Sequence, residues 1–218
     1  MKSPLNPDRK KHRFGKAWMH AHVNDAYVRE AQRLGYRSRS AFKLIELAEK
    51  DKLFRRGMTV VDLGAAPGSW CQVLRERVGP QAKIIAVDLL PMHPLPGVTH
   101  IQADFSTDEG LRAVEAALGS ARADLVLSDM APNLSGIDSA DQARSIHLAE
   151  LALEFASSAL QPNGDLVVKV FQGAGLADFQ RAAAQLFTKT YIRKPKASRD
   201  RSREVFVVAK QRRDPPAP

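Results

Sequence analysis

The chain has 218 residues, of which 44% are hydrophobic and 26% are charged. This length and apolar content suit one α/β domain with a sizeable core and leave little room for a second domain. The single cysteine excludes an internal disulfide framework, and no apolar run approaches the ~18 residues that span a bilayer. Since the N-terminus also lacks the apolar stretch of a secretory signal, we expect a cytoplasmic protein with no membrane partner.

Basic residues outnumber acidic ones and gather near the two ends of the chain. There are 33 lysine and arginine residues against 24 aspartate and glutamate residues, a formal net charge of +9. The basic residues concentrate in residues 1–16 and in "RKPKASRDRSRE" at 193–204. Clustered positive charge favours a polyanionic partner such as RNA or DNA, whereas solubility is the plain alternative.

Residues 1–23 are expected to form a basic, flexible arm, and helices are expected near 25–34 and 40–50. Apolar strand-like runs then alternate with helical patterns. The expected strands are "MTVVDL", "KIIAVDL", "VTHIQA", "ADLVLSD", "DLVVKVF", "TKTYIR" and "EVFVVA", and the helices between them lie near 69–78, 107–118, 140–160 and 175–186. This alternation predicts an α/β domain over 24–210, with a mainly parallel sheet, helices on both faces and a flexible tail at 211–218.

The last strand is expected to run against the others. Only the basic segment "RKPKASRDRSR", which contains Pro195, separates the last two strands. A parallel connection needs a crossover that is usually helical, and a proline-containing basic segment is a poor helix former. An antiparallel last strand brings Glu204, at its start, to the edge where the parallel strands end and where ligands of such sheets bind.

The stretch "VDLGAAPGSW", residues 61–70, leads from an apolar strand into a glycine-containing turn and a helix. Such turns hold nucleotides, because glycine lets the backbone approach the ligand. Gly64 and Gly68 are spaced G-x-x-x-G, which argues against the G-x-G-x-x-G turn of a dehydrogenase. Asp88 and Asp104 end or follow the next two strands, where carboxylates can bind a nucleoside, although aspartates also cap turns.

Three charged residues occupy positions that are unfavourable without a partner or a task. Lys169 interrupts the apolar run "DLVVKVF", Asp129 ends "ADLVLSD" and Glu204 opens "EVFVVA". A strand in the middle of a parallel sheet seldom accepts a lysine that has no partner. We expect the three side chains to meet at one sheet edge, either as a catalytic group or as a structural ion-pair network.

Several linked motifs extend from about Tyr27 to Ala209: "GYRSRSAFKL", "DKLFRRGMTVVDLGAAPGSW", "VDLLPM", "SDMAPNLSG", "LVVKVFQG" and "SREVFVVA". Together they resemble the FtsJ (RrmJ, RlmE) family of S-adenosylmethionine-dependent ribose 2′-O-methyltransferases, which act on large-subunit ribosomal RNA. The resemblance implies a Rossmann-like methyltransferase fold with a seven-stranded sheet. It also implies a catalytic set that falls here on Lys43, Asp129, Lys169 and Glu204. Without the resemblance, Lys43 reads as a solvated helix residue that pairs with Glu46.

The implied cofactor is S-adenosyl-L-methionine, and we assign no metal ligands. Its family positions carry over to Gly64, Gly68, Trp70, Asp88, Asp104 and Asp129. The turn is further shaped by Asp62, Ala65 and Pro67. Ser69 stands where the family usually has a second glycine, and serine is acceptable at a helix N-terminus.

The implied reaction is methylation of a uridine 2′-hydroxyl in the A loop of 23S ribosomal RNA, on the assembled large subunit, by a monomeric enzyme. We take Lys169 as the base, because burial and a second nearby ammonium favour the neutral amine that can accept a proton. Asp129 would orient it, and Lys43 and Glu204 would steer the hydroxyl. A non-catalytic RNA-binding or ribosome-assembly protein is the main alternative, disfavoured by the central lysine. A dehydrogenase is disfavoured by the glycine spacing.

Overall fold

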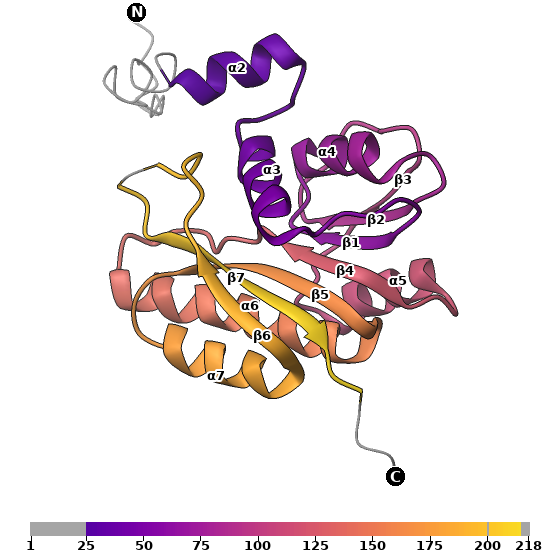
Figure 1. Ribbon diagram of the computed structural model, residues 1–218. Coiled ribbons are helices and arrows are strands. Elements are labelled where there is room, and N and C mark those ends of the chain that lie inside the picture. Colours follow the sequence, from indigo (N-terminus) through magenta and orange to yellow (C-terminus); the bar gives the residue numbers. More distant parts are fainter. Residues whose placement is uncertain (1–24, 200, 215–218) are drawn as a thin grey trace, which may run out of the picture.

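The computed structural model describes residues 25–199 and 201–214; the expected arm over 1–23 and residues 215–218 of the expected tail lie outside this range. The described part contains seven strands: β1 (Thr59–Leu63), β2 (Lys83–Asp88), β3 (Val98–Gln102), β4 (Ala123–Ser128), β5 (Leu160–Phe171), β6 (Phe187–Arg193) and β7 (Glu204–Arg212). They form one sheet in the order β3-β2-β1-β4-β5-β7-β6 (Figure 1). The expected seven-stranded α/β sheet is confirmed.

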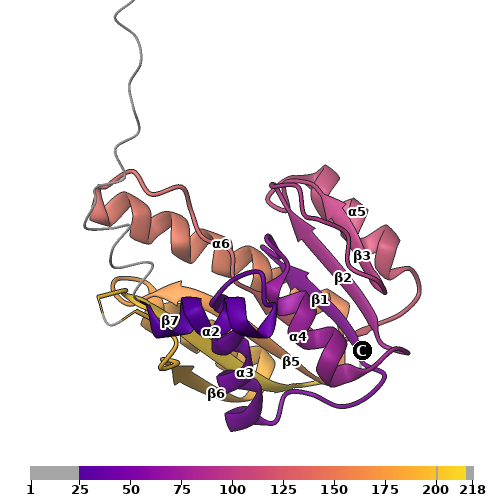
Figure 2. The same cartoon turned by 90° about the horizontal axis from the view of Figure 1, so that it is seen from above.

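Helices lie on both faces of this sheet. They are α2 (Ala26–Leu34), α3 (Ser40–Asp51), α4 (Ser69–Val78), α5 (Asp108–Leu118), α6 (Asp138–Ala159) and α7 (Leu176–Leu186). Buried side chains of α3 and α4 belong to one apolar cluster, and those of α5, α6 and α7 to another. Seen from above, α3 and α4 lie on one side of the sheet, and α5 and α6 on the other (Figure 2). None of these helices is long and apolar enough to cross a membrane.

The direction of the last strand agrees with the expectation. Strands β1 to β5 pair in parallel, whereas β7 is antiparallel to both of its neighbours, β5 and β6. It extends to Arg212, three residues beyond the apolar stretch "EVFVVA" from which it was expected. The extension pairs Arg212 with Phe187, so residues 211 and 212 belong to the sheet. The basic segment 194–203 therefore connects two antiparallel neighbours without a helix.

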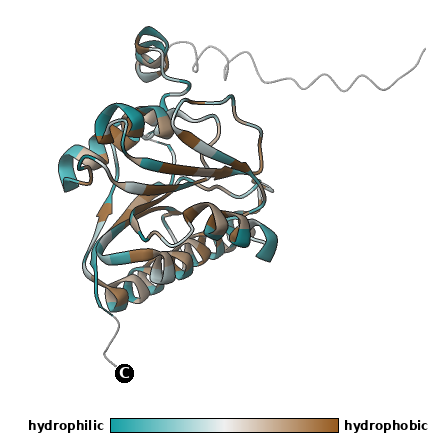
Figure 3. Cartoon of the chain, turned by 90° about the vertical axis from the view of Figure 1, so that its right-hand side faces the viewer, coloured by the Kyte–Doolittle hydropathy of each residue, from teal (hydrophilic) through white to brown (hydrophobic). Residues whose placement is uncertain are grey.

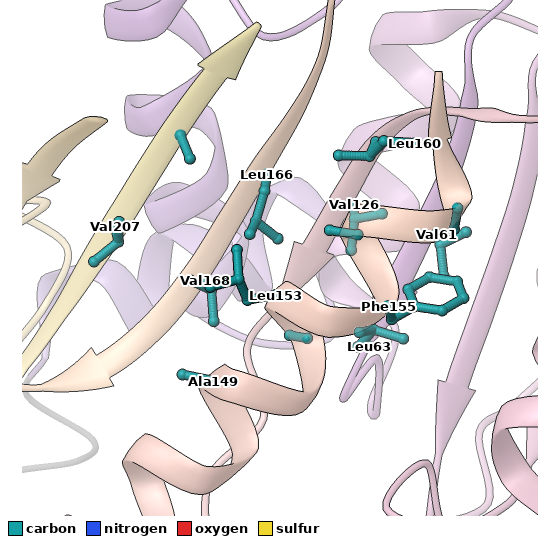
Figure 4. Close-up of a cluster of buried hydrophobic side chains, with 14 of the residues drawn as sticks. Val61, Leu63, Val126, Ala149, Leu153, Phe155, Leu160, Leu166, Val168 and Val207 are labelled. Carbon is teal, nitrogen blue, oxygen red and sulfur yellow. The ribbon is translucent and has the colours of Figure 1, made fainter. Parts of the chain in front are cut away.

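The inner strands β1, β2, β4, β5 and β7 are mostly buried on both faces, whereas the edge strands β3 and β6 are partly exposed. Hydrophobic residues concentrate in the strands, and hydrophilic residues lie along the outer helices (Figure 3). Figure 4 shows Val61, Leu63, Val126 and Val168 of the sheet in one cluster with Leu153 and Phe155 of α6. A single chain thus builds two apolar layers, with the sheet between them.

The strand order favours a ligand site next to β1. The chain continues from β1 to β2 and β3 on one side, and from β4 to β5 on the other, so the sheet has its topological switch point between β1 and β4. Ligands of open α/β sheets bind outside the carboxyl ends of the strands at such a point. The Asp129 backbone N–H donates a hydrogen bond to the Leu63 carbonyl at 3.0 Å, which joins the two strand ends there.

Candidate active site

Lys169 has the partner that its burial requires. It lies near the end of β5, and its side chain is only 9% exposed. Its Nζ lies 2.9 Å from the Asp129 Oδ1 atom and donates a hydrogen bond to the Asp129 carbonyl at 2.6 Å. The ammonium is thus held at two points by the residue that follows β4. The structure brings together the lysine and the aspartate that the sequence placed at one edge.

A second ion pair joins α3 to the first residue of β7. The Lys43 Nζ atom of α3 is 2.7 Å from the Glu204 Oε1 atom, with both side chains largely buried. Glu46, the alternative partner of Lys43, instead accepts hydrogen bonds from the backbone N–H groups of Lys196 and Ala197 at 2.6 and 2.9 Å. The interpretation of Lys43 as a solvated helix residue paired with Glu46 is therefore wrong. We call Lys43, Asp129, Lys169 and Glu204 the tetrad.

Strand register aligns the two pairs. In the antiparallel ladder of β5 and β7, Lys169 faces Phe206 and Phe171 faces Glu204. Residues directly opposite each other share a face of the sheet, so Lys169 and Glu204 are diagonal neighbours. The Lys43 ammonium also lies 5.9 Å from the centre of the Phe206 ring, a cation–π distance. An antiparallel β7 thereby closes a cluster that strands β4 and β5 alone could not complete.

Asp129 carries the negative charge at the centre of the cluster. Burial alone would raise the pKa of Asp129, but the nearby ammonium groups of Lys169 and Lys43 lower it below its usual value. The Ser40 hydroxyl donates a further hydrogen bond to the Asp129 Oδ2 atom at 2.9 Å. Asp129 is therefore ionised at neutral pH. The sequence analysis missed Ser40, because no local pattern indicates that its hydroxyl contacts Asp129, which is 89 residues away in the chain.

The glycine turn lies against the same strand end. At Gly64 φ is +79°, and a Cβ atom there would lie 2.8 Å from the Met130 backbone nitrogen. At Gly68 φ is +101°, and a Cβ atom would lie 2.6 Å from the Met92 sulfur. Such distances exclude a larger side chain at either position without movement of the neighbours. The two glycines thus bring the loops after β1, β2 and β4 close together.

Arg37 fastens this turn to the loop after β2. Its Nη1 atom donates hydrogen bonds to the carbonyls of Pro67 at 2.9 Å and His93 at 2.7 Å, and its Nη2 atom donates to Pro94 at 3.2 Å. One guanidinium therefore holds two loops that are about 27 residues apart in the chain. Arg37 was not singled out from the sequence, since nothing local marks an arginine that binds distant carbonyls.

Asp88 and Asp104 lie at the expected strand ends, and both also stabilise turns. Asp88 accepts hydrogen bonds from the backbone N–H groups of Ala66 and Leu90, each at 2.8 Å. Asp104 accepts from Ser106 through its backbone N–H at 2.9 Å and its hydroxyl at 2.6 Å. An ionised carboxylate has about four acceptor sites, so turn capping leaves capacity for a ligand. Nucleoside binding by either aspartate stays a prediction.

Trp70 has a clear packing role. Its side chain is buried, and its indole N–H donates a hydrogen bond to the Ser40 carbonyl at 2.8 Å. Its ring lies 6.0 Å from the Phe206 ring. Trp70 thus ties α4 to the first residue of α3 and to β7, and so supports the helix that carries Lys43. A direct contact between Trp70 and a cofactor stays a prediction.

Asp62 is a fully buried carboxyl group beneath the glycine turn. Its Oδ2 atom accepts a hydrogen bond from the Cys71 thiol at 3.3 Å, and its Oδ1 atom has no hydrogen-bond partner among the described residues. Burial raises the pKa of Asp62 to about 7, with smaller contributions from the charges of Asp129 and Asp88 and an opposing one from Cys71. The pKa of Asp62 is therefore raised, whereas that of Asp129 is lowered. Within residues 25–199 and 201–214, no three His, Cys, Asp or Glu side chains form a group that could hold a metal ion.

A family model described as FtsJ-like methyltransferase matches residues 36–212, which include the tetrad and the glycine turn. The chain belongs to the FtsJ-like methyltransferase family. Two bacterial relatives, both named ribosomal RNA large subunit methyltransferase E, are each 56% identical to this chain. The one from Azoarcus sp. (strain BH72) aligns over 91% of this chain and 97% of its own length, and the one from Nitrosomonas europaea over 90% and 95%.

Solved structures agree with this family assignment. A Plasmodium falciparum chain described as a ribosomal RNA methyltransferase superposes with a TM-score of 0.73 at 30% identity, over 81% of this chain and 98% of that one. Human methyltransferase-like protein 13, solved in complex with SAH, superposes with a TM-score of 0.57 at 14% identity, over 79% and 83% of the two chains. The second likeness shows the fold alone. The Rossmann-like methyltransferase fold expected from the sequence is confirmed.

The raised pKa of Asp62 predicts a pH dependence of stability. Its folded value of about 7 lies above an unfolded value near 3.9, so the folded protein binds more protons between these pH values. Asp62 therefore makes stability fall as the pH rises from about 4 to about 7. Asp62→Asn is neutral throughout and should lack this loss. Urea unfolding of both proteins between about pH 5 and pH 8 measures the difference, with Asp178→Asn at an exposed site as the control. Parallel stability curves for the wild type and Asp62→Asn would contradict the assignment.

Proposed function

We propose that the protein transfers a methyl group from S-adenosyl-L-methionine to the ribose 2′-hydroxyl of a uridine in 23S ribosomal RNA, in the A loop of the assembled large subunit. The observation that carries this proposal is the tetrad: two ion pairs, at 2.7 and 2.9 Å, beside a glycine turn at the switch point of the sheet. The names of the bacterial relatives support large-subunit ribosomal RNA as the substrate class. The resemblance of the motifs supports the uridine 2′-hydroxyl as the acceptor.

The residues around the turn fit this cofactor. Gly64 and Gly68 leave backbone without side chains at the switch point, and Asp88 retains acceptor sites for ribose hydroxyls. Asp129 is ionised, which favours a cationic ligand nearby. When bound, S-adenosylmethionine supplies a methyl group on a cationic sulfur that needs no further activation. Asp88 and Asp104 would hold its nucleoside, and Asp129 its methionine end.

The main task of the protein's own groups is then to orient the ribose. Holding two reactants in a productive geometry removes much of the entropic barrier of a bimolecular step. Lys43 and Glu204 fix each other at 2.7 Å and would position the 2′-hydroxyl. Lys169, held by Asp129 at two points, would take the hydroxyl proton on its Nζ atom after its ammonium group has released a proton to solvent.

The basic segment 194–203 would hold the RNA next to the tetrad. Glu46 binds two of its backbone N–H groups, which fastens the segment to α3. Arg193, just before it, is paired with Asp51 through hydrogen bonds of 2.6 and 2.9 Å and serves the fold. Arg201 and Arg203 are exposed and can contact phosphates. Since the segment leads directly into Glu204, phosphates bound there lie close to the reacting ribose.

Replacement of Asp88 by Ala should weaken S-adenosylmethionine binding by about 1–3 kcal/mol, because ribose hydroxyls lose their acceptor. That loss is a ~5-fold to ~150-fold higher Kd in calorimetry. Asp88→Asn keeps an acceptor oxygen for only one of the two turn hydrogen bonds, so it should lower the melting temperature less than Asp88→Ala does while it still binds the cofactor less tightly. Unchanged affinity in both variants would leave Asp88 with the turn-capping role alone.

Two variants of Lys169 separate a base from a structural cation. Lys169→Met removes the ammonium and leaves the buried Asp129 carboxylate without its nearest partner, so it should lower both stability and activity. Lys169→Arg keeps a positive charge but cannot lose a proton. Because general-base assistance is worth ~10²–10⁴-fold, both should lose at least ~10²-fold in single-turnover methyl transfer. A Lys169→Arg enzyme of near-normal rate would show that charge alone is needed.

Neutralising the basic segment should change the salt dependence of RNA binding. Arg201→Gln with Arg203→Gln removes two exposed cations, and each lost phosphate contact should reduce the slope of log K against log salt by about 1. Arg112→Gln with Arg122→Gln removes two exposed arginines from α5 and from the opposite end of β4 and serves as the control. Filter binding to large-subunit particles at several salt concentrations provides the slopes. Equal slopes for both double variants would place the RNA surface elsewhere.

A further inference from the structure

Exposed aliphatic side chains cluster on the loops at the carboxyl edge of the sheet. Six large hydrophobic residues among the described ones are strongly exposed, and four of them follow β2 or β4: Leu89, Leu90, Leu134 and Ile137. Leu134 and Ile137 are 69% and 62% exposed and belong to the connection between β4 and α6. Neither the tetrad nor the glycine turn accounts for two aliphatic residues held in water beside the site.

The loop that carries them is held in place. Asp141, a buried residue in the first turn of α6, accepts hydrogen bonds from the Ser135 backbone N–H at 2.8 Å, the Ser135 hydroxyl at 2.7 Å and the Gly136 backbone N–H at 3.1 Å. These hydrogen bonds lower the pKa of Asp141, and the one from the Ser135 backbone N–H has the largest effect. Leu134 and Ile137 flank this anchored pair. The loop thus presents both side chains in a fixed arrangement, which reduces the entropy that a partner would have to remove.

Charged residues lie at both ends of the loop. It begins at Asp129, a member of the tetrad, and Asp138 at its end pairs with Arg203 of the basic segment at 3.2 Å. Figure 1 shows the connection from β4 to α6 passing beside the connection from β6 to β7. Arg144, on the next turn of α6, has a 57% exposed side chain. Along the chain, the aliphatic pair therefore lies between Asp129 of the tetrad and the exposed Arg144.

We propose that Leu134 and Ile137 pack against an unpaired nucleobase adjacent to the ribose that is methylated. The inference rests on the proposed function and adds a contact that reads the state of the RNA. Arginines beside the loop would contact phosphates, and the aliphatic pair would cover the apolar face of a base. Aliphatic side chains can cover such a face only when the base is unstacked, as in loops and bulges of RNA. The pair would therefore favour a target in a non-helical segment.

The test uses a double variant that carries both Leu134→Ala and Ile137→Ala. Its control is Ile192→Ala, which removes a 41% exposed isoleucine from β6, a strand at the edge of the sheet. The substrate is large-subunit particles from cells that lack this methyltransferase. The double variant should lose about tenfold or more in kcat/KM for the particles, because two buried aliphatic contacts disappear. Its Kd for S-adenosylmethionine and its melting temperature should match the wild type, and Ile192→Ala should behave as the wild type in all three measurements. Wild-type kinetics of the double variant would overturn the inference.

A photo-cross-linking side chain at position 134, introduced as Leu134→p-benzoylphenylalanine, identifies the partner directly. Cross-links to a nucleotide next to the methylated ribose support the inference. Cross-links to a ribosomal protein, or to distant RNA only, contradict it. In the same assays, failure of the wild type to methylate a 2′-hydroxyl would instead overturn the proposed function, so the two failures are distinguishable.

Discussion

The ion pair between Lys169 and Asp129 is the interaction on which the rest of the site depends. It joins the ends of the two central strands β4 and β5, and it keeps a lysine in the sheet at 9% exposure. Removal of one partner from a buried pair generally costs about 3–5 kcal/mol, whereas an apolar replacement of both partners is often neutral. A pair of this kind therefore adds little to stability that a valine and a leucine could not provide. The chemical role proposed above for Lys169 would explain why the pair is present.

Charge balance extends the pair to the tetrad. Lys43 and Glu204 add a second ammonium and a second carboxylate, so the four charges sum to zero at one edge of the sheet. Each carboxylate satisfies one lysine at less than 3 Å, which limits the desolvation cost of both cations. The arrangement requires β7 to run antiparallel, because only that direction places Glu204 at the edge where β4 and β5 end. The antiparallel direction of β7 is thus a condition for the formation of the tetrad.

The sequence alone predicts the sheet, its antiparallel last strand and the meeting of Lys169, Asp129 and Glu204, since all three follow from strand patterns and strand ends. It does not place Lys43, whose local spacing indicates a pair with Glu46; the resemblance to the family places it. Ser40 and Arg37 escape prediction for a common reason. Their partners, Asp129 and the carbonyls of distant loops, are neighbours only after the chain has folded.

The local role of the two aspartates that were predicted to bind the nucleoside also could not be determined from their spacing in the sequence. Asp88 and Asp104 were candidates for either a ligand contact or a turn, and the structure shows the turn contacts of both. These roles are compatible, because a carboxylate that is fixed by backbone N–H groups is already oriented when a ligand arrives. Trp70 likewise supports α3 from the interior. Hydrogen bonds within the protein therefore already fix the positions of Asp88, Asp104 and Trp70.

The two carboxyl groups nearest the switch point divide their work by environment. Asp129 is kept ionised by two ammonium groups, whereas Asp62, buried against the Cys71 thiol, has its pKa raised to about 7. If Asp62 carried a full charge, it would lie unpaired beneath the turn and repel Asp129, at a cost that burial makes large. Partial protonation relieves that cost. A positively charged ligand next to the turn would reverse the balance and favour ionised Asp62.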